Sequence, residues 1–490
     1  MNSIAPDRFR ASALLTDLYQ LTMAYGYWKS GTHEKEAVFH LFFRKAPFQS
    51  GFTVAAGLED AIAWLQELHF SESDLAYLAT LTGNDGAPLF ERAFLEFLRE
   101  LRFTGEVDAV PEGTVVFPNE PLLRLRGPIL QGQLAETALL NFINFQTLIA
   151  TKSARICQAA QHEPVLEFGL RRAQGVDGAL AASRSAFIGG CAATSNVLAG
   201  QCFGIPVKGT HAHSWVMSFA DEPEAFRAYA EAMPNNCVFL VDTYDTLEGV
   251  HRAVEAGKWL RQRGHEMAGI RLDSGDLAYL SIEARRILDE GGFPKAVIIA
   301  SNDLDEHIIT SLKQQGARIG LWGVGTKLVT AFDQPALAGV YKLAAIRQRG
   351  GQWEYKVKLS EQAVKISTPG ILQVRRFSRA GEFVGDMIYN EAAPPAGARV
   401  LVDPTNVTRR KAIGMDATAE DLLVPIFRGG RLVYEMPALA AIRDRARAQL
   451  GCLHAGTRRI LNPHEYPVGL EAGLFDLKTS LIFKARPVAA

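Results

Sequence analysis

Short apolar runs rich in β-branched residues recur in the middle of the chain, and each ends in a polar or glycine cluster that leads into a helical pattern. The six runs are VLEFGLRR (165–172), IPVKGTHAHS (205–214), CVFLVDTYDT (237–246), AGIRLDSGDL (268–277), AVIIASNDLDE (296–306) and IGLWGVGTKL (319–328). Their spacing of roughly 25–40 residues is the length of one strand plus one crossover helix. Apolar strands that alternate with helices predict a parallel sheet covered on both faces, and six such units predict an α/β barrel.

The regions on either side of these runs show a different pattern. Helical periodicity covers residues 12–30, 53–69, 87–101 and 133–161, and Pro and Gly punctuate a strand-like stretch at 105–130. Ser12 or Thr16 is the candidate cap of the first helix. After residue 345, strand-like pieces (EYKVKLS, ILQVRRF, GEFVGDMIY and ARVLVDP) lead to a helical tail. We therefore expect an N-terminal α+β domain (1–140), a barrel domain (141–345) and a C-terminal segment (346–490) that packs with the N-terminal domain.

Composition narrows the class of protein. The 490 residues include 52 Lys plus Arg and 53 Asp plus Glu, a balance that gives no sign of a nucleic-acid or membrane partner. The five cysteines are scattered without a C-x-x-C pair, which argues against a disulfide framework or a structural zinc site. Asp7, Arg8 and Arg10 precede any apolar stretch, so we expect no signal peptide, and no apolar run has the length of a membrane span. A cytoplasmic protein is expected.

Candidate chemistry lies where the predicted strands end, because the catalytic residues of α/β barrels are found at that rim. In LDSGDL, Asp273 and Asp276 can hold Mg²⁺ or ribose hydroxyls, although Asp and Ser also cap helices at such turns. Arg271, in the strand before them, can form an internal ion pair or bind a carboxylate or phosphate. Both alternatives remain open for each of these residues.

Two further strand ends have the character of phosphate-binding loops. Gly323 and Gly325 let the backbone approach an anion, the following helix offers free N–H groups, and Thr326 adds a hydroxyl. Asn302, in the SNDLDE loop, occupies an equivalent place after its own strand. Ordinary strand-to-helix turns have the same composition, so these loops alone do not establish a phosphate site.

The GTHAHSW segment offers two histidines, His211 and His213, one residue apart. On a strand both rings would share a face, as in some metal sites, but no third and fourth ligands stand at fixed spacing. A histidine that transfers protons or acts as a nucleophile needs an orienting partner, and Asp242 at the end of the next strand can supply it. In EFGLRR, Phe168 can stack on a flat ring while Arg171 neutralises an anion; the plainer alternative is a buried ring beside a solvated basic residue.

Together and in this order, the motifs resemble the nicotinate phosphoribosyltransferase family along nearly the whole chain. The motifs that carry the resemblance are LLTDLYQLTMAYGYW, NFINFQTLIATKSAR, EFGLRRAQGVDGALAASRSAFIGG, GTHAHSWV, FLVDTYDT, GIRLDSGDL, GVGTKLVT, GVYKLAA and NPHEYPVGL. The resemblance implies an irregular α/β barrel of the type II phosphoribosyltransferase kind, flanked by an α+β domain built from both termini. It also implies a homodimer with shared active sites, and nicotinate, 5-phosphoribosyl 1-pyrophosphate, ATP and Mg²⁺ as substrates and cofactor.

The resemblance assigns roles to particular residues. Tyr19 would reach into the neighbouring subunit's site, where it and Phe168 would stack on the two faces of the pyridine ring. His213 would take a phosphoryl group from ATP as a phosphohistidine, with Asp242 orienting its ring, and His211 receives no role. The remaining substrate-binding positions would be Arg171, Ser195, Thr210 and Arg271 near nicotinate and the phosphoribosyl group, Asp273 on the ribose hydroxyls, Asp276 near Mg²⁺-pyrophosphate, and Asn302, Gly323, Gly325 and Thr326 around the 5-phosphate.

Three other functions stay open at this point. The nicotinamide-specific transferases resemble this chain but have an acidic residue where Ser195 stands, and an acid there would repel the nicotinate carboxylate. A regulatory paralogue would bind phosphoribosyl pyrophosphate without turnover. A metal-dependent barrel hydrolase would use His211 and His213 as ligands.

Overall fold

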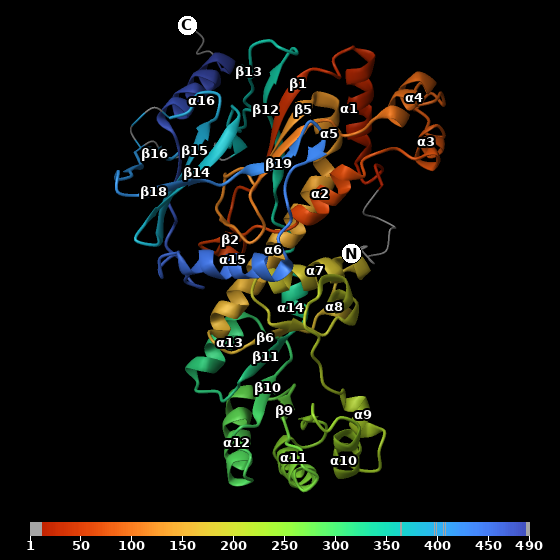
Figure 1. Ribbon diagram of the computed structural model, residues 1–490, viewed down its shortest axis with the longest axis vertical. Helices are drawn as coiled ribbons and strands as arrows, with labels where there is room; N and C mark the ends of the chain where they lie inside the picture. The colour runs from red at the N-terminus through yellow and green to blue at the C-terminus, as the bar shows by residue number, and fades with distance from the viewer. Residues whose placement is uncertain are drawn as a thin grey trace. The chain divides into compact units, whose positions relative to one another are not determined.

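The computed structural model describes residues 12–486, except 363, 364, 396, 398, 405 and 407 (Figure 1). The expectation built on Asp7, Arg8 and Arg10 falls outside these residues. Contacts divide the chain into two compact units. The first unit combines Met1–Leu148 with Ala336–Ala490, and the second is Ile149–Pro335. Each unit is described by itself below.

The second unit is built on a sheet of six parallel strands. In sheet order the strands are β7 (Ala193–Thr194), β6 (Val165–Glu167), β11 (Leu321–Val324), β10 (Val297–Ala300), β9 (Gly269–Leu272) and β8 (Val238–Leu240). This is the cyclic order of a barrel in which each strand follows its neighbour in sequence. Strands β8 to β11 are short and almost wholly apolar, which suits a sheet covered on both faces. The prediction of an irregular α/β barrel is confirmed.

One predicted strand, at 205–214, is wrong. Only Val207 makes a ladder contact, an isolated parallel bridge to Thr194. Pro206 has no N–H to donate to a ladder, and the apolar run ends at Val207, one residue after it. The short strand β7 was not predicted, because two residues give no periodic signal. Within the described part of the chain no ladder joins β7 or Val207 to β8, so the barrel is irregular at this position.

Helices cover the outside of the second unit's sheet. Helices α11 and α12 contact β9, and α12 also contacts β10 (Figure 1). Most of these helices begin at an aspartate or asparagine whose side chain accepts a backbone N–H, as at Asp245, Asp276 and Asp305. The helices are α7 (Gly175–Ile188), α8 (Val197–Phe203), α9 (His213–Met217), α10 (Glu222–Ala232), α11 (Thr246–Arg261), α12 (Leu277–Glu290), α13 (Glu306–Gln314) and α14 (Thr326–Val329), with the 3₁₀ turn η2 (Leu170–Arg172).

Two larger sheets form the first unit, and both termini contribute to it. The antiparallel sheet has the order β13 (Glu354–Tyr355), β12 (Val340–Arg347), β1 (Glu36–Phe42), β5 (Leu123–Pro128), β3 (Glu106–Ala109), β19 (Val424–Arg428) and β20 (Arg431–Leu432). The mixed sheet has the order β17 (Arg410–Ala412), β16 (Val400–Val402), β21 (Val468–Leu470), β15 (Glu382–Asn390), β14 (Leu372–Arg379) and β18 (Thr418–Asp421). Strands β2 (Thr53–Val54) and β4 (Val115–Val116) pair separately. The predicted flanking domain built from both termini is confirmed.

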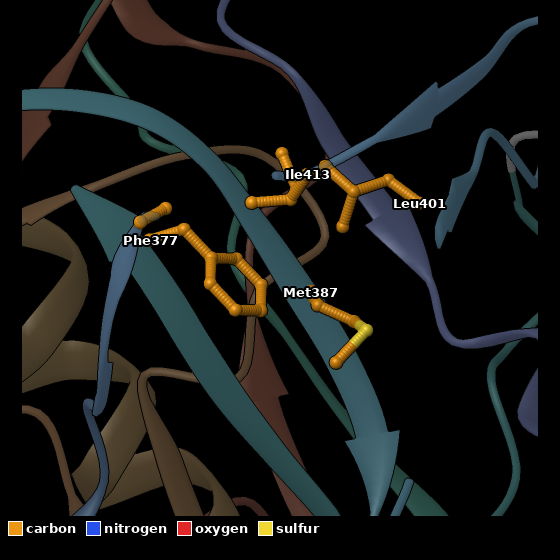
Figure 2. Close-up of a cluster of buried hydrophobic side chains, with 5 residues drawn as sticks. Phe377, Met387, Leu401 and Ile413 are labelled. Carbon is orange, nitrogen blue, oxygen red and sulfur yellow. The ribbon is translucent and has the colours of Figure 1, made fainter. Parts of the chain in front are cut away.

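The mixed sheet has an apolar core of its own. Phe377, Met387, Leu401 and Ile413 point toward one another from three strands and the turn after β17 (Figure 2). The first unit's helices are α1 (Leu18–Lys29), α2 (Leu58–Gln66), α3 (Glu72–Leu78), α4 (Arg92–Glu100), α5 (Ile129–Leu134), α15 (Leu439–Gly451) and α16 (Ala472–Ala485), with the turn η1 (Pro47–Gln49); α6 (Glu136–Ala160) contains the boundary between the units. No helix in the described ranges is long and apolar enough to cross a membrane.

Several predicted element boundaries in the first unit need correction. Helix α1 begins later than predicted, because Asp17 and Gln20 form a capping box and neither Ser12 nor Thr16 is the cap. The stretch 53–69 begins as strand β2 and becomes helical only after Gly57, where φ is 96° and a Cβ would lie 2.4 Å from a backbone oxygen. Helix α3 was missed, although Ser71 and Asp74 form a capping box at its start.

Candidate active site

The strand-end loops of the second unit enclose a cavity of about 590 Å³. Loops that follow β6, β9, β10 and β11 meet there, together with the segment 209–214. Sequence-predicted residues that line it are Phe168, Arg171, Ser195, Thr210, His213, Arg271, Asp273, Asn302, Gly323, Gly325 and Thr326. Leu170, Arg172, Gly209, His211, Ala212, Ser214, Ser301 and Asp303 complete the lining. The structure thus gathers residues spread over some 160 positions of sequence, from Phe168 to Thr326, into one pocket.

Backbone conformation shapes two sides of this pocket. Asn302 has φ 103°, a region that non-glycine residues rarely adopt and that is found mainly where a loop is under functional constraint. At Gly323 a Cβ would lie 2.6 Å from the ring of Phe168, so only glycine lets this ring pack against β11. Phe168 also donates its N–H to the Val324 carbonyl at 2.8 Å. The ring predicted to stack on a substrate is therefore held by the strand beside it.

The pocket contains positive charge that the protein does not fully neutralise. Arg271 donates from Nη1 to the Thr210 hydroxyl, while its Nε is buried with no hydrogen-bond partner among the described residues. Burial lowers the pKa of Arg271; Asp273 and Asp242 oppose this effect, and the nearby Arg171 adds to it. Two guanidinium groups that repel each other in a half-open pocket indicate a site for an anion.

His213 lies at the start of α9 with different partners on its two ring nitrogens. Nδ1 is 3.1 Å from the hydroxyl oxygen of Thr243. Nε2 is 4.0 Å from Oδ1 of Asp242 and 3.8 Å from Oδ2 of Asp273. Sequence reasoning missed Thr243; the only available signal was its position directly after Asp242.

Asp242 lies behind the pocket wall, and its carboxylate organises the neighbouring loop. Its Oδ2 accepts the Asp273 N–H at 2.8 Å and the Ser274 hydroxyl at 2.7 Å. Its Oδ1 is buried without a hydrogen-bond partner in the part of the chain described. The free oxygen is the one that faces Nε2 of His213, so a small shift of the ring would complete a hydrogen bond.

The two aspartates of LDSGDL have different surroundings. Asp273 lines the pocket and accepts a hydrogen bond from the Ser301 hydroxyl. Asp276 is exposed and caps α12, since its Oδ1 accepts the N–H groups of Ala278 and Tyr279, each at 3.1 Å. Across the described residues no group of three or more His, Cys, Asp or Glu could hold a metal ion. Mg²⁺ commonly binds through one or two carboxylates plus substrate phosphates, and the half-exposed Asp273 fits that arrangement.

His211 turns out to be part of the barrel wall. Its Nε2 accepts the Leu240 N–H of β8 at 3.2 Å, and its Nδ1 lies 3.3 Å from the Ala212 carbonyl. Burial lowers its pKa to about 4, so the ring is neutral and can accept this bond. The side chain thereby satisfies a backbone donor of β8, the edge strand of the described sheet. Neither nitrogen is left for a metal.

A buried carboxylate behind the pocket was also missed. Glu167, 1 % exposed, accepts hydrogen bonds from the Gly169 N–H, the Ser183 hydroxyl at 2.8 Å and the Thr194 hydroxyl at 2.6 Å. Its own carbonyl accepts the Ser195 N–H at 2.9 Å. Glu167 therefore links the loop that carries Phe168 to the turn that carries Ser195.

Tyr19 is the one predicted site residue that belongs to the first unit. It lies on α1 with 49 % of its surface exposed. Burial of part of the ring, followed by the negative charge of Glu136, raises the pKa of its hydroxyl. The pocket of the second unit does not by itself include this ring.

Comparison with known proteins places these features in a family. Models of the nicotinate phosphoribosyltransferase N-terminal domain, family and C-terminal domain match residues 14–144, 164–358 and 373–478. A nicotinate phosphoribosyltransferase of Bacillus subtilis is 47 % identical over 97 % of this chain and 96 % of its own. One of Homo sapiens is 36 % identical over 97 % of each chain.

Solved structures agree with the sequence matches. The crystal structure of human nicotinic acid phosphoribosyltransferase superposes with a TM-score of 0.80 at 34 % identity, covering 96 % of this chain and all of that one. A nicotinate-nucleotide pyrophosphorylase from Pyrococcus furiosus has a TM-score of 0.70 at 22 % identity, covering 92 % of this chain and 98 % of that one, and this likeness concerns the fold alone.

Proposed function

The chain belongs to the nicotinate phosphoribosyltransferase family, and on that premise we propose that the pocket at the rim of its barrel is where nicotinate is joined to 5-phosphoribosyl 1-pyrophosphate. The products of this activity are nicotinate mononucleotide and pyrophosphate, and it contributes to NAD biosynthesis from nicotinate. The observation that carries the assignment of the pocket is that Arg271, Thr326 and His213, which come from separate strand-end loops, all line one cavity.

Nicotinate is a flat aromatic anion, and one side of the pocket suits it. The Phe168 ring offers a stacking surface worth about 0.5–1.5 kcal/mol beyond its burial. Ser195 can donate a hydroxyl hydrogen to the carboxylate, and the unpaired Nε of Arg271 and the guanidinium of Arg171 supply positive charge. Thr210 is already bonded to Arg271, which supports a place for it beside the same substrate.

Phosphoribosyl pyrophosphate fits the opposite loops. Asn302, Gly323, Gly325 and Thr326 border the pocket where β10 and β11 end and α14 begins, and these loops would hold the 5-phosphate. Asp273 is placed to accept the ribose hydroxyls. Transfer proceeds through an oxocarbenium-like ribose while negative charge grows on pyrophosphate, and the pocket's arginines stabilise that charge. Mg²⁺ held by Asp273, and by the Oδ2 that the cap leaves to Asp276, would neutralise the pyrophosphate further.

His213 is proposed to take the γ-phosphoryl group of ATP. Carboxylates near Nε2 favour the tautomer that keeps the proton there, so Nδ1 has the free electron pair. The P–Nδ1 bond forms as the bond from phosphorus to the β,γ-bridging oxygen breaks, and ADP leaves with that electron pair. Water later takes the phosphoryl group as inorganic phosphate. Glycosyl transfer alone is close to balanced, so this cycle draws the reaction toward the mononucleotide.

The proposed dimer gives Tyr19 its function. The half-exposed Tyr19 ring would cover the neighbouring subunit's pocket and form the second face of a sandwich with Phe168. Tyr19→Ala would then raise the KM for nicotinate while the isolated pocket stays intact. Mixing Tyr19→Ala with Arg271→Ala subunits tests the sharing, because a mixed dimer regains one complete site; no recovery of activity contradicts it.

One assay addresses the activity and the role of ATP. Purified protein with nicotinate, phosphoribosyl pyrophosphate and Mg²⁺ should form nicotinate mononucleotide, and ATP should stimulate it. Terminally labelled ATP should leave an acid-labile, base-stable label that His213→Asn abolishes. Unlabelled wild-type protein, or a labelled His213→Asn variant, would contradict the phosphohistidine.

Competition between substrates separates the remaining candidates. Preference for nicotinamide over nicotinate would contradict the role given to Ser195, and tight binding without product would indicate a regulatory paralogue. The hydrolase alternative loses support because both ring nitrogens of His211 are engaged. A cytoplasmic setting is proposed from the five cysteines, which are all thiols.

A further inference from the structure

We propose that Thr243 is a positioning residue for His213, whose hydroxyl aims the nucleophilic Nδ1 and then stabilises the phosphoryl group that Nδ1 receives. The inference rests on the phosphohistidine of the proposed function. Thr243 does not line the pocket, so it acts through the imidazole and touches no substrate before phosphorylation.

The backbone at Thr243 is fixed from the neighbouring residue. Thr243 follows β8 by three residues and comes directly after Asp242. The Asp242 side chain is 1 % exposed and is anchored by two donors, the Asp273 N–H and the Ser274 hydroxyl. A residue attached to such an anchor has little freedom, so its hydroxyl meets Nδ1 at 3.1 Å without further loss of backbone entropy.

The imidazole is contacted at both ends by groups of different kinds. The carboxylates of Asp242 and Asp273, 4.0 and 3.8 Å from Nε2, can only accept a hydrogen bond. The Thr243 hydroxyl can donate one to Nδ1. A ring turned by 180° would present carbon atoms to all three partners, so these contacts select one orientation and one tautomer. This selection fixes the direction of the Nδ1 electron pair and keeps the proton on Nε2. The Thr243 hydroxyl holds that electron pair in the resting state and turns away from it when phosphorus approaches.

The hydroxyl also has a task after phosphoryl transfer. Once the P–Nδ1 bond has formed, Nδ1 has no free electron pair in the ring plane, and the Thr243 hydroxyl loses its acceptor there. Rotation about its C–O bond lets it donate to a phosphoryl oxygen instead, because a hydroxyl hydrogen is free to turn. A hydrogen bond to this charged group is stronger than one to the neutral ring. Thr243 therefore stabilises the phosphorylated state more than the resting state, and its loss should slow phosphorylation.

The test compares Thr243→Val, which keeps the shape and removes the hydroxyl, with Thr243→Ser, which keeps the hydroxyl. Tyr244→Phe is the matched control, since it removes an exposed hydroxyl at the next position. The rate of phosphoenzyme formation is measured in single turnover with labelled ATP and phosphoribosyl pyrophosphate. Thr243→Val should be about 10- to 100-fold slower, with the ATP concentration for half-maximal rate changed much less. Thr243→Ser and Tyr244→Phe should stay within about threefold of wild type.

A spectroscopic measurement separates positioning from folding. In ¹⁵N-histidine-labelled protein, the His213 signal, identified by its absence in His213→Asn, should report one tautomer in wild type and a mixture in Thr243→Val. Wild-type rates in Thr243→Val, or equally slow rates in Thr243→Ser, would overturn the role of the hydroxyl. If wild-type protein takes up no phosphoryl label from ATP, the phosphohistidine and this inference are both overturned. If wild type and Thr243→Val take up the label at equal rates, the inference alone is overturned.

Discussion

Two arginines in this protein, the buried Arg376 and the half-buried Arg271 of the pocket, have opposite surroundings. In the first unit, Arg376 is 1 % exposed and forms three hydrogen bonds to Asp386, at 3.0, 3.1 and 2.5 Å. In the second unit, the Nε of Arg271 has no partner in the described ranges, and its hydrogen bond runs from Nη1 to a neutral threonine. Arg376 therefore has a carboxylate counter-ion within the protein, whereas no carboxylate among the described residues lies at ion-pair distance from Arg271.

The pKa values of the two arginines shift in opposite directions for this reason. Burial by itself lowers the pKa of each guanidinium. At Arg376 the adjacent Asp386 carboxylate outweighs burial and raises the pKa, whereas at Arg271 burial outweighs the more distant Asp273 and Asp242. A charge that is partly buried without a counter-ion destabilises the fold. Such a charge in a pocket therefore indicates a place where a bound anion supplies the missing negative charge.

The largest expected effect comes from removing the carboxylate that pairs with Arg376. Asp386→Ala would remove the counter-ion of the buried Arg376 and leave it the Gln449 amide oxygen as an acceptor, and it would also remove the acceptor of the Tyr466 hydroxyl, 2.8 Å away. The free energy of unfolding should fall by about 3–5 kcal/mol, measured by urea denaturation. The KM for nicotinate of the protein that remains folded should not change. Tyr466→Phe is the milder control, with a loss of about 1 kcal/mol; equal stability of all three proteins would contradict the structural role.

Arg271→Leu should have the opposite balance of effects. Removal of an incompletely paired, half-buried charge should leave the melting temperature unchanged or higher. At the same time kcat/KM should fall about 100- to 1000-fold, because the lost donors act on charge in the transition state. Arg271→Lys keeps the charge but not the planar fork, so it should recover only part of the activity. A lower melting temperature together with normal kcat/KM would show that Arg271 is structural and would remove the contrast with Arg376.

The sequence predicted the surroundings of Arg271 better than those of Arg376. Arg271, Asp273 and His213 stand at the ends of apolar strands, and parallel strand ends meet at one rim, so topology alone brings them together. Arg376 and Asp386 lie on paired strands of one hairpin, but nothing in their local pattern shows that both are buried. Thr243 and Glu167 were missed for a similar reason, because their function depends on contacts 16 to 30 residues away. The false strand at 205–214 shows the limit of apolar runs that contain proline.

Lys478 has surroundings intermediate between those of Arg376 and Arg271. Lys478 in the first unit is 8 % exposed, donates to the Thr368 hydroxyl at 3.2 Å and has no carboxylate at ion-pair distance within the described residues. Burial lowers its pKa from 10.5 to about 8. Between pH 8 and 10.5 the unfolded chain keeps this proton and the folded chain does not, so stability should rise with pH across that window. Below pH 8 both states are protonated and the penalty is constant.

Lys478→Met should therefore be more stable than wild type at neutral pH, by about 2–3 kcal/mol. The difference should shrink as the pH rises from 8 toward 10.5, where the wild-type lysine is neutral in the folded state. Denaturation midpoints of both proteins at several pH values give the comparison. A pH-independent difference would mean that packing and not charge distinguishes the two proteins, and a less stable variant would mean that the lysine is compensated.

The smallest expected effect concerns the two pocket loops that follow β10 and β11. Lys327, one residue after Thr326, donates to Oδ2 of Asp305 at 2.6 Å, and Asp305 caps α13 through its Oδ1. The Lys327 charge, and with it the helix cap, lowers the pKa of Asp305 even though burial would raise it. This ion pair connects the loop after β11 to the loop after β10, where Asn302 holds its unusual φ.

Lys327→Met should lower stability by about 1 kcal/mol, since the pair is only partly buried. It should raise the KM for phosphoribosyl pyrophosphate about three- to tenfold, because the two loops that border the phosphate lose their connection while every group that faces the ligand stays in place. The KM for nicotinate should change less, since Phe168 and Ser195 are held by Glu167 and not by this pair. Initial rates with each substrate varied in turn measure the split. Equal increases in both KM values would show that the two sides of the pocket are not independent. The proposed division into a nicotinate side and a phosphate side would then be wrong.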